Sequence, residues 1–236
     1  MAKVPLGPRL GLRLLAYEVD ASWCERVHRA IEKEIARGQR RLEKLQESGN
    51  EEAFDSMNDE EGDHIEELLG IAFVACQAFI NRVLNQVQGL NETCKQQFGR
   101  PIALLAGRQQ TLQVEDSKLS GSSIASIEAL YAVGNYWKHS EEWPTCEVSV
   151  DGRSRYVWDL SKMRPIQKST FRVVSQMGLC YGSTGNLRTA AKALGWQDCG
   201  DLRPIRRALH SWAKEVLRVA QTSVDELTRK SAKSKP

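Results

Sequence analysis

The segment Leu68-Leu-Gly-Ile-Ala-Phe-Val-Ala-Cys-Gln-Ala-Phe-Ile-Asn-Arg-Val-Leu84 is the strongest indication of how this 236-residue chain folds. Apolar residues lie on almost every side of a helix built from it, and such a helix is buried inside a fold. A glycine and three polar residues interrupt the run, so it is too short and too polar to span a bilayer. We therefore expect a central helix from about Asp63 to Val87 in a soluble, cytoplasmic protein without a membrane partner.

The flanking sequence predicts further helices and a mainly α fold. Ser22-Trp-Cys-Glu25 is a capping-box pattern, in which serine and glutamate satisfy free backbone N–H groups, and it predicts a helix over residues 22–46. Residues 47–63 are acidic and rich in turn-forming types, which favours a partly mobile loop. A third helix is expected to begin in the serine cluster at residues 120–123 and to run into the Asn135–His139 segment, ending before Pro144.

The sequence changes to an alternating pattern after residue 144. Two alternating segments flank Asp151-Gly152, a dipeptide typical of two-residue hairpin turns, and predict a β-hairpin insert against the bundle. Pro165 favours the start of a fourth helix, where its missing N–H costs nothing. We thus expect a mainly α helical bundle with a small β-hairpin insert: a bundle in residues 1–144, the insert in 145–160, C-terminal helices of the same domain in 161–229 and a disordered basic tail in 230–236.

The net charge of +3 conceals an uneven distribution along the chain. Residues 46–70 carry ten acidic side chains and neither lysine nor arginine, whereas residues 161–236 carry fifteen basic side chains and five acidic ones. A basic region of this kind suits a nucleic-acid partner. It equally suits the acidic segment of the same chain or of a neighbouring subunit, or a solvated helix face.

The six cysteines are scattered, and no two of them have C-x2-C or C-x4-C spacing. No histidine lies three to five residues from a cysteine pair, so a zinc site is not expected. A chain of this length buries a sufficient core without disulfide bonds. We therefore expect reduced thiols, no metal ion and no cofactor.

The densest chemistry lies in the segment Asn135-Tyr-Trp-Lys-His139. Asn135 and His139 are four residues apart at the end of the third expected helix, and this spacing places both side chains on one face. Histidine exchanges protons near neutral pH, so His139 is a candidate general acid or base. The structural alternative is a histidine that caps the last carbonyl groups of the helix.

The neighbouring side chains suit a nucleic-acid ligand. Lys138 adds a cation beside the histidine. Aromatic rings on which a base can stack are supplied by Tyr136, Trp137 and Trp143. These rings also fit the structural alternative, in which they anchor the end of the helix in the core.

The run Val133-Gly-Asn-Tyr-Trp-Lys-His139 resembles the active-site motif of the HEPN superfamily, Arg-Asn-x-x-x-His, which projects from a late helix. The resemblance implies a bundle of four or five helices. In many members it implies metal-independent ribonuclease activity in toxin–antitoxin, phage-defence or RNA-surveillance systems. It also implies that the sites of two protomers face each other across a dimer. Asn135 and His139 match the family's asparagine and histidine.

The family's arginine falls on Gly134, which offers no cation for the phosphate charge that develops in a transition state. Lys138 or Arg108 would have to supply that charge, and Gly134→Arg would then restore or raise activity. This departure favours a non-catalytic or RNA-binding relative over an active nuclease. Lys138 completes the candidate catalytic set, and Arg108 is a candidate substrate-binding residue.

Two further groups are candidates for supporting roles. We expect Glu66 or Glu67 to meet the Asn135–His139 segment in one polar cleft near a subunit interface, although acids at a helix start are also favoured by the helix dipole. Residues 187–195 and 201–209 resemble a helix-turn-helix, and an ordinary basic helical hairpin is the alternative. The DNA contacts of such a motif would come from Arg203, Arg206 and Arg207.

These observations leave three functions open. The first is a HEPN-like protein of a defence or toxin–antitoxin type system that binds RNA or, if it is an enzyme, cleaves RNA without a metal. The second is a non-catalytic interaction module, such as an antitoxin, an immunity protein or a subunit of a larger complex. The third is a helix-turn-helix DNA-binding regulator. The expected partner is RNA or a protein of a defence system, and the expected assembly is a homodimer or a larger complex.

Overall fold

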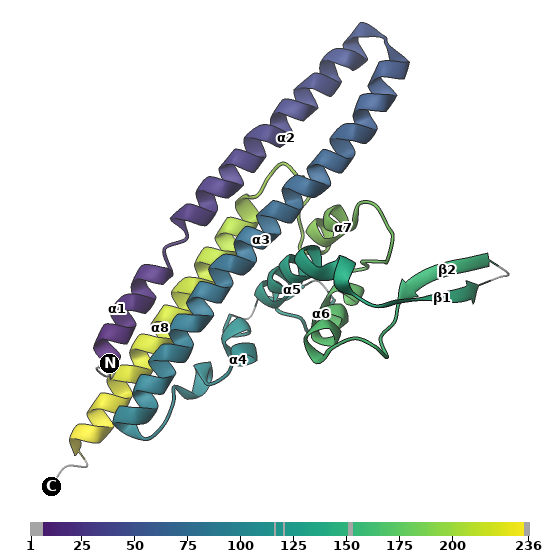
Figure 1. Ribbon diagram of the computed structural model, residues 1–236. Helices are drawn as coiled ribbons and strands as arrows, with labels where there is room; N and C mark the ends of the chain where they lie inside the picture. The colour runs from purple at the N-terminus through teal and green to yellow at the C-terminus, as the bar shows by residue number, and fades with distance from the viewer. Residues whose placement is uncertain (1–6, 116, 120, 151–152, 234–236) are drawn as a thin grey trace, which may run out of the picture.

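The computed structural model describes residues 7–233 apart from 116, 120, 151 and 152. The expected mainly α-helical bundle with a small β-hairpin is confirmed (Figure 1). In chain order the elements are α1 (Pro8–Glu18), α2 (Ser22–Ser48), α3 (Glu51–Phe98), a 3-10 helix (Ala103–Leu105), α4 (Arg108–Leu112), α5 (Ser126–His139), a second 3-10 helix (Ser140–Glu142), β1 (Thr145–Val150), β2 (Arg153–Trp158), α6 (Pro165–Gln176), α7 (Asn186–Ala193) and α8 (Arg203–Lys233).

The central element is α3, as the sequence predicts. Helices α1, α2 and α8 lie along one side of it, while α5 and α7 pack on another (Figure 1). Phe73, Phe79 and Ile80 are completely buried, because the apolar residues of α3 face neighbouring helices in several directions. By length and composition α3 qualifies as a membrane span, but its most apolar window is 61% buried inside the fold, which is typical of the core helix of a soluble protein.

The far ends of α2 and α3 project beyond the other helices as a two-helix arm, which we define as residues 42–60 (Figure 1). Residues 47–63 were expected to form a loop. The structure corrects this expectation, because residues 51–63 belong to α3. The turn between the two helices is short: Gly49 ends α2 with a φ of 69°. Asn50 then caps α3 by accepting a hydrogen bond from the Ala53 N–H (3.1 Å).

The loop expectation was wrong because it gave polarity more weight than helix propensity. Glutamate, which occurs five times in this segment, is a good helix former, as are Ala53 and Met57. Glu51 and Glu52 also lie in the first turn of α3, where the helix dipole favours negative charge. An acidic segment with these properties extends a helix rather than interrupting it.

Three other boundaries differ from the expectation. Asp20 Oδ1 accepts a hydrogen bond from the Ser22 N–H (2.9 Å) at the start of α2, and the capping box of Ser22 does not form. The serines before α5 form a turn in which Ser122 Oγ accepts a hydrogen bond from the Ile124 N–H (3.1 Å), so α5 begins at Ser126. At the C-terminus, residues 230–233 of the expected disordered tail form the end of α8, where the dipole favours basic side chains. Residues 234–236 lie outside the described part.

The hairpin and the helix after it have the expected form. β1 and β2 pair antiparallel with Val150 opposite Arg153, a register that leaves two residues for the turn. Those two residues, Asp151 and Gly152, lie outside the described part of the chain. The hairpin was expected to lie against the bundle, but it projects from it (Figure 1), and Trp158 at its base is buried. Pro165 occupies the first turn of α6, as expected.

Candidate functional site

The position of the candidate site follows from how closely α5 lies on α3. A Cβ atom on Gly134 would lie 2.7 Å from the Phe73 carbonyl oxygen and 2.7 Å from Gln77 Cβ, distances that side chains do not adopt. One turn further along, the indole of Trp137 fills the space beside Gly70, where a side chain would overlap the ring. Two glycines, one on each helix, therefore let α5 pack against the backbone of α3.

This contact corrects the expectation for Gly134. The position at which the HEPN arginine falls faces the α3 backbone, so it has no room for a long basic side chain. Gly134→Arg would push α5 away from α3 and would not place a cation in the site. Any cation for a phosphate group must come from elsewhere in the pocket.

Asn135 and His139 lie together, as the four-residue spacing predicts. Both side chains line a pocket of about 280 Å³ between the end of α5 and the start of α6. The pocket is open on one side and mixes polar with apolar surface. Its lining residues are Asn135, His139, Glu142, Trp143, Arg164, Ile166, Gln167 and Thr170.

A carboxylate lies beside the histidine, but it is not one of the two expected from α3. His139 Nδ1 is 3.0 Å from Glu142 Oε1, and Arg164 Nη2 is 3.5 Å from the other oxygen of the same carboxylate. The hydrogen bond with His139, aided by the charge of Arg164, lowers the pKa of the Glu142 carboxyl group. Glu142 therefore stays ionised near neutral pH and orients the imidazole through Nδ1, which leaves Nε2 as the ring atom for a ligand.

Asn135 is held in place by α3. Its Oδ1 accepts a hydrogen bond from the side-chain amide of Gln77, which is buried in α3. Arg108 lies further back along the same face: it donates to Asn81 Oδ1 (2.6 Å) and stacks 4.5 Å above the ring of Tyr131, one turn before Asn135. Arg108 is thus near the face of α5 that carries the site, but it does not line the pocket.

Two of the three expected stacking rings are largely buried, although Trp143 also borders the pocket. Tyr136 and Trp143 are buried and pack edge to face with each other and with Trp158. The Tyr136 hydroxyl accepts a hydrogen bond from Asn186 Nδ2 (2.8 Å), and burial raises the pKa of Tyr136. Trp137 remains 38% exposed over Gly70, so it is the candidate ring that offers a face to solvent.

The expected carboxylates on α3 do not reach the pocket. Glu66 accepts hydrogen bonds from the backbone N–H groups of Leu187 (2.8 Å) and Arg188 (3.0 Å), and it pairs with Arg188 Nε (3.0 Å). It therefore caps α7, where the dipole favours its charge. Glu67 is exposed and has no hydrogen bond or ion pair with the described residues. The expected convergence is wrong for these acids, and Glu142 lies beside His139 instead.

Two of the three candidate arginines of α8 are engaged within the fold. Arg203 binds both oxygens of Asp201, whose pKa it lowers to about 2, and Arg206 Nη1 lies 2.9 Å from Glu32 of α2. Arg207 is exposed. α8 is also a 31-residue helix packed along α1 and α3, unlike a short recognition helix presented to DNA. This packing argues against the helix-turn-helix reading.

The pocket also contains residues that the sequence did not single out. Glu142 lies three residues after His139, a helical spacing that was available as a signal. Arg164 directly precedes α6, and Gln167 and Thr170 lie in it, roughly 25 to 30 residues after His139 in sequence. No local pattern places them beside His139, because their approach depends on how α6 packs against α5.

Comparison with known proteins gave no further guide to this site. No family model matches the chain, and no curated protein or solved structure matches it either.

Proposed function

We propose that this chain is a HEPN-like protein that binds single-stranded RNA at the pocket between α5 and α6. The observation that carries the proposal is the joint placement of Asn135 and His139 on one pocket with Arg164. Lys138 is exposed on the turn that contains His139. The site thus combines two cations, a histidine and an amide, groups that contact phosphates and unpaired bases.

Binding without cleavage fits this site better than ribonuclease activity. The motif's arginine position is closed by α3, and Arg164 already faces the Glu142 carboxylate. A developing phosphate charge would therefore meet no fixed, unpaired cation buried in the pocket. The side chain of His139 is 44% exposed, so water would also weaken its electrostatic effect. As a cytoplasmic protein of a defence or toxin–antitoxin type system, acting as a dimer, the chain would recognise RNA rather than destroy it.

The test is binding of a fluorescently labelled single-stranded RNA, followed by anisotropy over a range of salt concentrations. Arg164→Ala and Lys138→Ala should each weaken binding and lower the salt slope by about 0.7, the value for one lost phosphate contact on a single strand. Arg218→Ala is the matched control, because Arg218 is an exposed arginine of α8 that pairs with Glu215. Equal binding by the pocket variants and the wild type would contradict the proposal.

The same RNA decides between binding and catalysis. Wild-type protein should leave the RNA intact in the presence of a chelator. Metal-independent cleavage that disappears in His139→Ala would turn the proposal into a nuclease, because loss of a general acid or base costs about a hundred- to ten-thousand-fold in rate. Cleavage that survives His139→Ala would place the activity outside this pocket.

A second candidate, a non-catalytic interaction module, is favoured by the two-helix arm. The arm carries a large part of the acidic segment and exposes most of it. A projecting pair of helices without a third helix to cover it is suited to a protein partner with a basic surface. Replacing Glu51, Glu52 and Asp55 with lysine should release such a partner without changing RNA affinity. Arg164→Ala should instead weaken RNA binding and leave the partner bound.

A further inference from the structure

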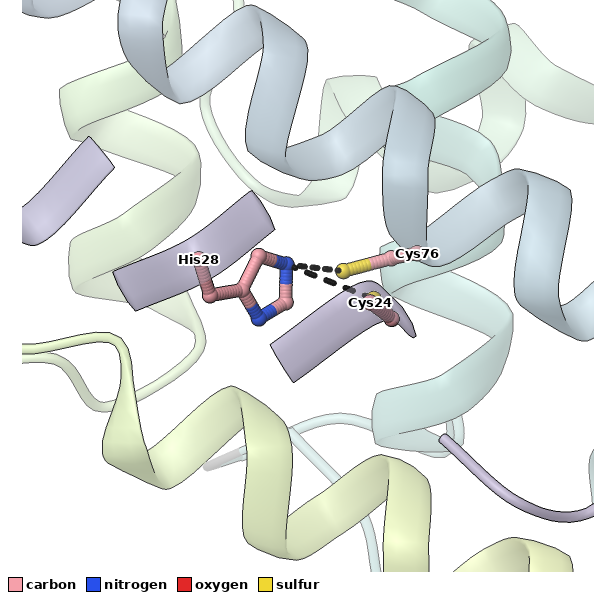
Figure 2. Close-up of side chains that lie close together, drawn as sticks. All are labelled: Cys24, His28 and Cys76. Carbon is pink, nitrogen blue, oxygen red and sulfur yellow. Dashed lines mark hydrogen bonds between the residues drawn. The ribbon is translucent and has the colours of Figure 1, made fainter. Parts of the chain in front are cut away.

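A cluster of three side chains joins α2 to α3 inside the core. Cys24 and His28 are one turn apart on α2, and Cys76 lies on α3. All three are buried, with at most 1% of their surface exposed. Figure 2 shows both thiols directed at the same nitrogen of the His28 ring. Part of this cluster can be seen in the sequence, since Cys24 and His28 are four residues apart and such residues share a helix face.

The distances in the cluster match those between the ligands of a metal ion. His28 Nε2 is 3.5 Å from Cys76 Sγ and 3.6 Å from Cys24 Sγ, and the three donor atoms lie within 4.8 Å of one another. A tetrahedral zinc ion lies about 2.3 Å from sulfur and about 2.0–2.1 Å from nitrogen, which sets such a pair roughly 3.5 Å apart. The carbonyl oxygen of Ala72, 3.3 Å from Nε2, is a further donor at similar spacing.

Neither ring nitrogen of His28 makes a short hydrogen bond to the described residues. Nε2 approaches three groups but lies beyond the usual 2.7–3.2 Å range of an N–H···O bond to Ala72. Nδ1 is buried and has no hydrogen-bond partner among the described residues. Buried polar atoms are normally satisfied, so the long contacts of Nε2 leave that nitrogen available to an ion, whereas an ion at Nε2 does not account for the unpaired Nδ1.

Cysteine binds metals as the thiolate, so an ion in this cluster would displace the thiol protons of Cys24 and Cys76.

We propose that Cys24, His28 and Cys76 bind one thiophilic metal ion, Zn²⁺ or Cu(I), which clamps α2 to α3. Two thiolates and an imidazole are ligands that both ions accept. The ion would be structural, because the site is buried and is formed from the core faces of two helices. This site is independent of the RNA pocket, which uses other residues of α5 and α6.

The test uses the full-length chain, purified with a reductant, stripped of metal with a chelator and then titrated without oxygen. Zn²⁺ and Cu(I) are added in separate titrations, and metal bound after gel filtration is measured by mass spectrometry. We expect about one equivalent of Zn²⁺ or Cu(I) per chain and a rise in Tm of about 5 °C.

Matched variants assign the ligands. Cys24→Ser and Cys76→Ser should lose both the bound ion and the rise in Tm. Cys94→Ser should keep both, because Cys94 is also buried in α3 but does not belong to the cluster. Equal metal uptake by Cys24→Ser and the wild type would overturn the proposal.

Two further measurements remain decisive if a serine variant does not fold. Titration of the wild type with Co²⁺ should produce a thiolate-to-cobalt charge-transfer band, and absence of this band together with no uptake of Zn²⁺ or Cu(I) would overturn a site of this ligand set. Mass spectrometry under non-reducing conditions distinguishes a disulfide between Cys24 and Cys76. Such a disulfide, together with no metal uptake after reduction, would also contradict the metal proposal.

Discussion

At Gly134 the absent side chain lets two helices approach each other more closely than any other residue type would allow. The Phe73 carbonyl oxygen occupies the space that a Cβ atom would need. Glycine normally weakens a helix by about 1 kcal/mol relative to alanine. Here the close helix packing that glycine permits outweighs that cost. The same packing leaves no room at this position for the arginine of the HEPN motif.

Gly134→Ala should therefore destabilise the protein, although alanine is the better helix former. Overpacking against the Phe73 and Gln77 atoms is expected to cost about 1–3 kcal/mol. Gly89→Ala is the control, since Gly89 lies in α3 with no atom within 4 Å of an added Cβ, and it should stabilise by about 0.5–1 kcal/mol. Urea unfolding measures both changes. Similar effects at the two positions would show that α5 does not lie this close to α3.

Neighbouring residues of the Asn135–His139 segment have different environments because a helix turns by about 100° per residue. Tyr136 points into the core and Trp137 lies over Gly70. Asn135 and His139 share the pocket, while Lys138 is exposed. Residues 135–139 are adjacent in sequence, but their side chains therefore lie in different places: in the core, in the contact between α5 and α3, in the pocket or in solvent.

At the scale of elements, α7 depends on a carboxylate from another helix. α7 is eight residues long, and its own N-cap residue, Gly185, provides no side-chain acceptor. Glu66 supplies the acceptor from α3 and binds Arg188 as well. A short helix of this kind is marginal by itself, so tertiary capping decides whether it forms.

Glu66→Ala should therefore unfold more easily than the wild type, by about 3 kcal/mol, since two backbone N–H groups and Arg188 lose a charged acceptor. The adjacent Glu67→Ala serves as control and should change the free energy of unfolding by no more than about 0.5 kcal/mol, because Glu67 is exposed. Chemical denaturation of the two variants makes the comparison. Equal losses would indicate that Glu66 acts through surface charge rather than as a cap.

The whole molecule combines a long helical bundle with one part that has few neighbours. Along the bundle, α3 is surrounded by α1, α2, α5 and α8. Beyond it, α2 and α3 continue as the arm and pack mainly on each other (Figure 1). The arm buries less apolar surface for each residue than the bundle does, so its local stability is expected to be lower.

Hydrogen exchange followed by mass spectrometry should show this difference. Backbone amides of residues 44–58 are expected to exchange much faster than those of residues 72–84, because the arm opens without unfolding the bundle. Replacing Asn50 with alanine removes the cap at the start of α3 and should speed exchange in the arm further. Uniform protection along α3 would mean that an additional contact covers the arm, as a second subunit would.

The sequence alone was sufficient for the features that depend on nearby residues. Apolar residues on almost every side of the helix identified the core of α3, alternation around a turn dipeptide identified the hairpin strands, and Pro165 marked the start of α6. The spacing of Asn135 and His139 correctly placed them on one helix face. Each of these features depends on residues only a few positions apart, so the local pattern contains the information.

The tertiary structure decided everything that depends on contacts between distant segments. It placed Glu66 at α7 rather than at His139, brought Arg164 to the pocket and put Tyr136 and Trp143 inside the core. It also joined Cys24 and His28 to Cys76, some fifty residues away. Such contacts follow from the packing of whole helices, where many weak interactions act together, and no short segment determines them.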